Sequence, residues 1–153
     1  MQLLALLVVA LFGPTAGSPV DFLTTEEGQE VAEAAQNYLE KFQERDAAQL
    51  ALMGTDPFTF EGRVLKGQKE IETFYQKYFK VRGRAIPDLQ DVRVEVFDYA
   101  TALEKFGKPP KKFSHIPLKR CMFAAVHFEH RPGLLLILVK SKKEGWRVTA
   151  VTD

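Results

Sequence analysis

Cysteine is nearly absent from this sequence, which has 153 residues and a single cysteine, Cys121. One cysteine cannot form a disulfide within the chain, so the hydrophobic core has to hold the fold without a covalent link. A lone cysteine of this kind is typical of a small, buried apolar residue. The length is sufficient for one domain with a substantial core and too short for two.

An excess of charge of one sign is also lacking, because 21 Lys and Arg residues are nearly balanced by 20 Asp and Glu residues, for a net charge of +1. Such a balance provides no overall electrostatic attraction to nucleic acid or to a membrane surface. A composition that is 46% hydrophobic and 27% charged is that of an ordinary globular protein. We therefore do not expect a nucleic-acid partner.

Charged residues are missing from the first 20 positions. The segment Leu3–Phe12 is uninterruptedly apolar, which matches the core of a secretory signal peptide and is too short to span a membrane. Small residues at positions 15 and 17 predict cleavage before Ser18. We expect a signal peptide at residues 1–17, a folded domain at residues 18–153, and a secreted or lumenal protein. The alternative is a cytoplasmic or nuclear protein that retains this segment.

Several common catalytic and metal-binding motifs are absent as well. The sequence contains no glycine-rich phosphate loop, no CxxC pair and no serine or cysteine nucleophile motif. Its three histidines are His115, His127 and His130. Because alternate residues of a strand point to opposite faces, His127, Glu129 and His130 do not form a compact set of metal ligands. We expect neither a metal nor a cofactor.

The most informative stretch, Asp56–Phe79, predicts a short hairpin that leads directly into an amphipathic helix. Phe58 and Phe60 alternate with polar residues, as in a half-buried strand, and a glycine follows for the turn. In the helix predicted over Gln68–Phe79, large apolar residues recur at helical spacing. This apolar face consists of Ile71, Phe74, Tyr75 and Tyr78. Such a stripe has to be buried, so we expect Phe74 to belong to the core.

Two helices are predicted before this stretch and a series of strands after it. The first helix begins at Thr24, which forms a capping box with Glu27, and the second runs over Ala47–Met53 after Asp46. Strands are predicted over residues 92–97, 116–130, 134–139 and 146–152, and the first of them can extend over 101–106. Helices followed by an antiparallel sheet define an α+β fold.

The predicted order of elements resembles the nuclear transport factor 2-like superfamily, in which three amino-terminal helices pack in a strongly curved, mostly antiparallel sheet that forms a cone. The motif FEG-x3-KGQKEI, residues 60–71, is most similar to the transport-factor branch. The resemblance implies a homodimer formed through the sheet, and the apolar face of Leu134–Val139 is a candidate for that contact. It also implies binding by an aromatic-acidic pair at the mouth of the cavity, here Phe60 and Glu61.

The charge of one loop argues against the carrier function of that branch. Transport factors present acidic residues between their middle strands to hold a small GTPase, whereas the corresponding residues 105–112 of this chain include four lysines. Because the sign is opposite, we do not expect this GTPase as a partner. A nucleocytoplasmic transport adaptor is therefore the second alternative rather than the first choice.

Other branches of the superfamily are enzymes of the ketosteroid isomerase and scytalone dehydratase type, whose cavity holds a tyrosine or histidine together with carboxylates. An ungapped alignment from Tyr38 places Gly62 at the position of the isomerase's proton-transferring aspartate, so the pattern is broken at its central residue. Tyr38 does match the tyrosine position, and Asp98 with His127 could form a base and its orienting partner. Tyr38, Asp98 and His127 are thus the catalytic residues of the enzyme alternative.

These arguments favour a non-catalytic binding or interaction module over an isomerase or dehydratase. A strongly curved sheet packed against helices leaves an apolar cavity, and its expected occupant is a small apolar ligand or part of an unidentified protein. The expected binding residues lie on the first helix, the hairpin and the third helix. They are Tyr38, Phe60, Glu61, Phe74 and Tyr78.

The signal-peptide assignment predicts the amino terminus of the mature protein. Protein recovered from its native cells and from the surrounding medium should begin at Ser18 and be found outside the cells or in vesicles. Intact-mass spectrometry of the two fractions measures this directly. A cytosolic chain that still begins at Met1 would contradict secretion and would make the transport adaptor the leading interpretation.

Overall fold

The structure is a computed structural model that describes residues 21–82, 89 and 92–153. The predicted signal peptide at residues 1–17 lies outside the described residues. Within the described part of the chain, no helix is both long enough and apolar enough to cross a membrane.

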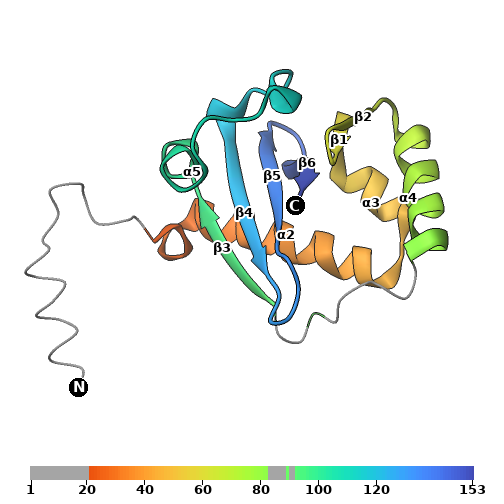
Figure 1. The fold of residues 1–153 in the computed structure, drawn as a ribbon, viewed down its shortest axis with the longest axis horizontal. Helices are drawn as coiled ribbons and strands as arrows, with labels where there is room; N and C mark the ends of the chain where they lie inside the picture. The colour runs from red at the N-terminus through yellow and green to blue at the C-terminus, as the bar shows by residue number, and fades with distance from the viewer. Residues whose placement is uncertain (1–20, 83–88, 90–91) are drawn as a thin grey trace, which may run out of the picture.

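The amino-terminal half is mainly helical (Figure 1). A 3-10 turn, η1 (Phe22–Thr24), leads into the long helix α2 (Glu26–Glu44), and the helices α3 (Ala47–Met53) and α4 (Gln68–Arg82) follow. The cap of α3 is the predicted one, because the Asp46 carboxylate accepts a hydrogen bond from the N–H of Gln49.

The predicted cap of α2 is wrong by one residue. The hydroxyl of Thr25, not Thr24, accepts the hydrogen bond from the N–H of Gly28. Thr24 belongs instead to η1, where its hydroxyl donates to the carbonyl of Asp21. The extra 3-10 turn therefore moves the helix start along the chain.

Six strands form one curved sheet in the order β2–β1–β6–β5–β4–β3 (Figure 1). They are β1 (Gly54–Phe60), β2 (Arg63–Leu65), β3 (Arg93–Phe97), β4 (Cys121–His127), β5 (Leu134–Ser141) and β6 (Gly145–Thr152). Every neighbouring pair is antiparallel except β1 and β6, which run parallel. The predicted fold class is confirmed: the chain is an α+β protein whose three amino-terminal helices pack in a curved, mostly antiparallel sheet.

The strand extension expected over residues 101–106 is wrong, because these residues form helix α5 (Tyr99–Phe106). The Asp98 carboxylate caps the helix by accepting a hydrogen bond from the N–H of Thr101 at 2.9 Å. Gly107 follows the last turn with a φ of 74°. The large residues of this segment are spaced at three and four positions, as a helix requires, and the alternating pattern of a strand does not continue beyond β3.

The long strand expected over residues 116–130 is shorter than predicted. Two 3-10 turns, η2 (Lys111–Phe113) and η3 (Leu118–Arg120), precede β4, which begins only at Cys121. Pro117 immediately precedes η3 and has no N–H to contribute to a strand pairing.

The sheet buries apolar residues on both of its faces. Helices α2, α3 and α4 cover one face, where Tyr38, Phe58 and Leu136 belong to the larger core cluster. On the opposite face, α5 and the 3-10 turns cover a smaller cluster that includes Phe123 and Ile137. Leu136 and Ile137 are at most 1% exposed, which confirms β5 as a central strand covered on both sides.

The expected dimer face is part of this second cluster. The apolar residues of β5 that point away from the long helices are packed against α5 and the turns of the same chain. Less of this face is therefore open to a partner than the sequence suggests, and dimerisation stays a prediction. Cys121 is buried in the same cluster, as expected, and burial raises the pKa of its thiol to about 11.

Truncation of an aromatic side chain to alanine should cost more stability in the core than in the cavity lining. Phe58 is fully buried with its ring centroid 6.1 Å from that of Tyr75, so Phe58→Ala should lower the free energy of unfolding by about 3–5 kcal/mol. Phe74, expected in the core, is only half-buried, so Phe74→Ala should cost clearly less. Chemical denaturation measures both. Equal losses for the two variants would show that Phe74 is a core residue after all.

Candidate functional site

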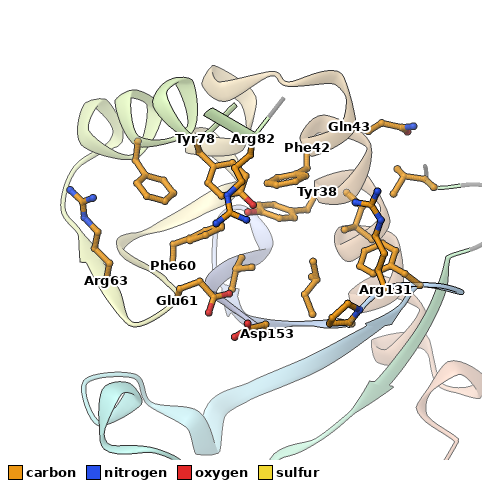
Figure 2. A pocket seen from close by; sticks show the side chains of 18 residues that line it. Tyr38, Phe42, Gln43, Phe60, Glu61, Arg63, Tyr78, Arg82, Arg131 and Asp153 are labelled. Atoms are coloured by element: carbon orange, nitrogen blue, oxygen red, sulfur yellow. The ribbon is translucent and has the colours of Figure 1, made fainter. Parts of the chain in front are cut away.

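A cavity of about 610 Å³ opens between α2, α4, the β1–β2 hairpin and the end of β6 (Figure 2). Its volume lies within the range of pockets that bind small molecules. The buried part of its lining consists of Tyr38, Leu39, Phe60 and Val151. Half-buried aromatic rings form much of the rest, and these are Phe42, Phe74, Tyr78 and Phe128.

Strand alternation places Phe60 in this lining. Phe58 and Phe60 point toward the helices, whereas Thr59 points to the other face, where its hydroxyl lies 2.7 Å from Nε2 of His115. The ring of Phe60 then meets the helix α4, with centroid distances of 4.9 Å to Phe74 and 5.2 Å to Tyr78. These offset and edge contacts are favourable for aromatic rings and give the cavity an apolar wall.

Glu61 lies at the mouth of the cavity, in the tight turn between β1 and β2. Its φ is 49° and that of Gly62 is 81°, as in a two-residue hairpin turn with both central residues in the left-handed region. The N–H of Glu61 donates to the carbonyl of Val151 at 2.9 Å, which ties the turn to β6. A left-handed backbone at a glutamate costs energy relative to glycine, and such residues are often found at functional sites.

Asp153, which follows β6, directs its carboxylate toward Glu61 (Figure 2). Although the Glu61 side chain is exposed overall, partial burial of its carboxyl and the neighbouring Asp153 raise the pKa of Glu61, and Lys112 opposes this shift. This edge of the mouth is acidic.

The Tyr38 hydroxyl forms a buried hydrogen bond with the hydroxyl of Tyr75. Burial raises the pKa of both phenols well above the ordinary value, so both are neutral over the physiological range. Only one of the two hydroxyls can donate to the other, and the accepting one keeps its own proton. The pair is therefore a neutral hydrogen bond buried beside the cavity, which Tyr38 lines.

Three arginines also line the cavity. They are Arg63, Arg82 and Arg131. The guanidinium of Arg63 lies over the ring of Phe74 at 5.6 Å from its centroid. Arg82 ends α4 and extends into the opening of the cavity in the view of Figure 2. The cavity thus combines an apolar interior with a mouth that carries charges of both signs.

All five binding residues expected from the sequence line this one cavity: Tyr38, Phe60, Glu61, Phe74 and Tyr78. Their binding of a ligand stays a prediction. The sequence reasoning missed Arg82, Arg131 and Asp153. Arg82 follows the predicted end of its helix, and Asp153 reaches Glu61 only through the pairing of two strands that are far apart in the chain, which no local pattern reveals.

The residues of the enzyme alternative are not brought together. Tyr38 lines the cavity, but Asp98 caps α5 and Nε2 of His127 lies 3.4 Å from Glu95. In the pairing of β3 with β4, Phe97 is opposite Phe123 and Arg93 is opposite His127. Asp98 and His127 are therefore about 15 Å apart along the sheet, at the usual rise per strand residue.

Metal ligation has no candidate group within the part of the chain that the structure describes, where no three His, Cys, Asp or Glu side chains cluster suitably.

Comparison with known protein families finds no match, and comparison with curated proteins finds none either. Solved structures do show similarity at low sequence identity. A domain of unknown function with a cystatin-like fold from Nostoc punctiforme is 16% identical, with 84% of this chain and 76% of that chain covered and a TM-score of 0.44. ActVI-ORFA from Streptomyces coelicolor is 14% identical, with 81% and 92% covered and a TM-score of 0.43. A cystatin-like fold protein from Burkholderia xenovorans is 14% identical, with 84% and 91% covered and a TM-score of 0.44.

The architecture itself defines the class as an α+β protein with a cavity between its helices and a curved sheet. Membership of the nuclear transport factor 2-like superfamily stays a prediction that rests on the order of elements. Membership of the transport-factor branch stays a prediction that rests on the hairpin motif.

The proximity of the Glu61 and Asp153 carboxyls predicts that Glu61→Gln raises the melting temperature by an amount that depends on pH. A raised pKa means that the stabilising contribution of Glu61 is present below its ordinary value of 4.5 and is lost as the pH rises through the folded value. At neutral pH the ionised side chain is therefore unfavourable, and Glu61→Gln should raise the melting temperature. This gain in melting temperature should shrink as the pH is lowered toward 4.5, the ordinary pKa of a glutamate. Thermal unfolding at several pH values measures it.

Glu104, an exposed residue of α5, offers a matched control for this experiment. Glu104→Gln should leave the pH dependence of the melting temperature as it is in the unmodified protein. If Glu61→Gln and Glu104→Gln behave alike, the carboxyls of Glu61 and Asp153 do not interact.

Proposed function

We propose that this protein is a non-catalytic binding module that holds a small, mainly apolar ligand in the cavity between α2, α4 and the hairpin. The observation that carries the proposal is the cavity of about 610 Å³ with its aromatic interior. Pockets of this size that are mostly apolar, with a few polar groups at defined positions, are the usual form of a small-molecule site. The Tyr38 hydroxyl and the charged mouth supply those polar groups.

The separation of Asp98 from His127 supports binding rather than the dehydratase-like alternative. Acid–base catalysis needs groups within hydrogen-bond reach of the same substrate, and neither residue lines the cavity. A second candidate, an isomerase, is favoured by one observation. Glu61, with its raised pKa, and the neutral Tyr38 hydroxyl line the same cavity, and could serve as proton carrier and oxyanion donor.

The cellular setting and assembly belong to the same proposal. The uncharged, apolar segment at residues 3–12 supports secretion or a lumenal location, and the resemblance to the transport factor supports a homodimer through the sheet. The transport adaptor is the alternative if the segment is retained. The lysines at residues 105–112 argue against the transport adaptor, because this region lacks the acidic charge that a contact with the small GTPase needs.

Titration with a neutral naphthylamine dye, whose fluorescence rises in apolar surroundings, tests the proposed site. The unmodified protein should bind the dye saturably, and Phe60→Ala should weaken binding about tenfold or more because a buried ring contact is lost. Phe106→Ala is the control, since Phe106 is 61% exposed and lies outside this cavity. Circular dichroism confirms that each variant is folded.

Absence of saturable dye binding would contradict the proposal, and so would an effect of Phe106→Ala equal to that of Phe60→Ala. Phe74→Ala serves as a second cavity variant, because Phe74 is only half-buried and its loss should disturb folding less. Turnover of a bound substrate that Glu61→Gln abolishes without loss of binding would establish the isomerase instead.

A further inference from the structure

A second hollow lies on the outer side of α4, and we call it the basic groove. Five cationic side chains line it, and these are Arg63, Lys66, Lys69, Lys77 and Arg82. Glu70 is the one carboxylate in its described lining. The basic groove is therefore strongly positive although the whole chain carries a net charge of only +1.

The basic groove is continuous with the cavity. Arg63, Phe74, Tyr78 and Arg82 line both hollows. A molecule that occupies the aromatic cavity and leaves through this side of the mouth would pass directly between cationic side chains.

The cations of the basic groove lack acidic partners within the described residues. None of the five forms a salt bridge there, whereas Lys41, Lys105, Lys140 and Arg147 elsewhere on the surface each pair with a glutamate. Glu70 does not neutralise the groove by pairing with one of its side chains, because its carboxylate accepts a hydrogen bond from the backbone N–H of Lys66 at 2.9 Å. The positive charge is thus concentrated and available to an anion.

Two carboxylates of the cavity lining lie outside the basic groove. Glu61 and Asp153 line the cavity but not the basic groove. They repel an anionic group near them, and the cations of the basic groove attract it. The charge distribution therefore gives a bound molecule a preferred direction, with any anionic end toward α4.

We propose that the ligand is an anionic amphiphile, with its apolar chain in the aromatic cavity and its carboxylate or phosphate group bound by Arg82 where the cavity meets the basic groove. This inference rests on the proposed binding function and specifies the chemistry of the ligand. The planar guanidinium of Arg82 matches the geometry of both anions. Phe74 and Tyr78 line the same hollow, and Arg63 with the three lysines adds positive potential around the contact.

Four amphiphiles with the same twelve-carbon chain test this proposal on the full mature chain: dodecanoate, dodecyl phosphate, dodecanol and dodecylamine. Each is titrated against the protein-bound naphthylamine dye at concentrations below its micelle threshold, and the loss of dye fluorescence measures its binding. Both anions should bind about tenfold more tightly than the alcohol, as expected for one charge-assisted contact, and the amine should bind most weakly. Higher salt should reduce the preference for anions.

Arg82→Gln should remove most of the preference for both anions over dodecanol, because the direct contact is lost while Arg63 and the three lysines still add positive potential. Arg63→Gln should reduce the preference in part, because Arg63 contributes potential rather than the direct contact. Lys142→Gln, in the exposed turn between β5 and β6, is the control and should change nothing. Arg82 is also in the last turn of α4, where a cation stabilises the helix end. Melting temperatures therefore show whether Arg82→Gln destabilises the helix or removes only the contact with the anion.

The outcomes distinguish the two proposals. Equal binding of anions and alcohol, or an anion preference as large in Arg82→Gln as in the unmodified protein, would overturn the anionic ligand while the cavity function stands. Failure of all four amphiphiles and of the dye to bind would overturn the cavity function itself. Binding to vesicles of anionic phospholipid without displacement of the dye would assign the basic groove to surface attachment and would also overturn the proposal.

Discussion

The arrangement of the molecule depends on the parallel pairing of β1 with β6. This pairing joins the helical amino-terminal half to the antiparallel strands of the carboxyl-terminal half, with Thr59 opposite Ala150 and Phe60 opposite Val151. It lets Phe60 face the helices and holds the Glu61 turn beside Asp153. Without this pairing, β1 and β2 would form an isolated two-stranded hairpin, which is marginally stable in water. The cavity would also lose the part of its lining that β6 provides.

Helix α4 connects the core, the cavity and the basic groove because its sides differ in chemistry. Ile71 and Tyr75 are buried in the core, Phe74 and Tyr78 are half-buried at the cavity, and Lys69 and Lys77 face outward. The helical repeat of 3.6 residues distributes these residues over adjacent faces. The apolar and cationic parts of the site therefore sit on one rigid element, which favours a bound molecule that has both an apolar and an anionic part.

Local patterns predicted much of the fold. The short helix was placed over Ala47–Met53, where α3 lies, since an aspartate cap and a following glycine mark its ends. The hairpin, α4 and β5 also agree with their patterns of alternation or helical repeat. Helix α5 is not predicted, because the strand was extended over its residues although their large side chains recur at helical spacing, and Asp98 was considered only as a catalytic residue of the enzyme alternative. An aspartate can be an N-cap or a catalytic residue, and only the conformation of the neighbouring backbone shows which role it has.

The sequence alone determined most of the helices and strands and most of the apolar residues that are buried, because helix and strand periodicity are properties of neighbouring residues. It also identified Tyr38, Phe60, Glu61, Phe74 and Tyr78, which line one cavity. The tertiary structure alone decided that Asp153 lies beside Glu61, that Arg82 joins the cavity to the basic groove, and that Asp98 and His127 stay apart. These relations depend on strand order and register between distant segments, and a local sequence pattern carries no information about either.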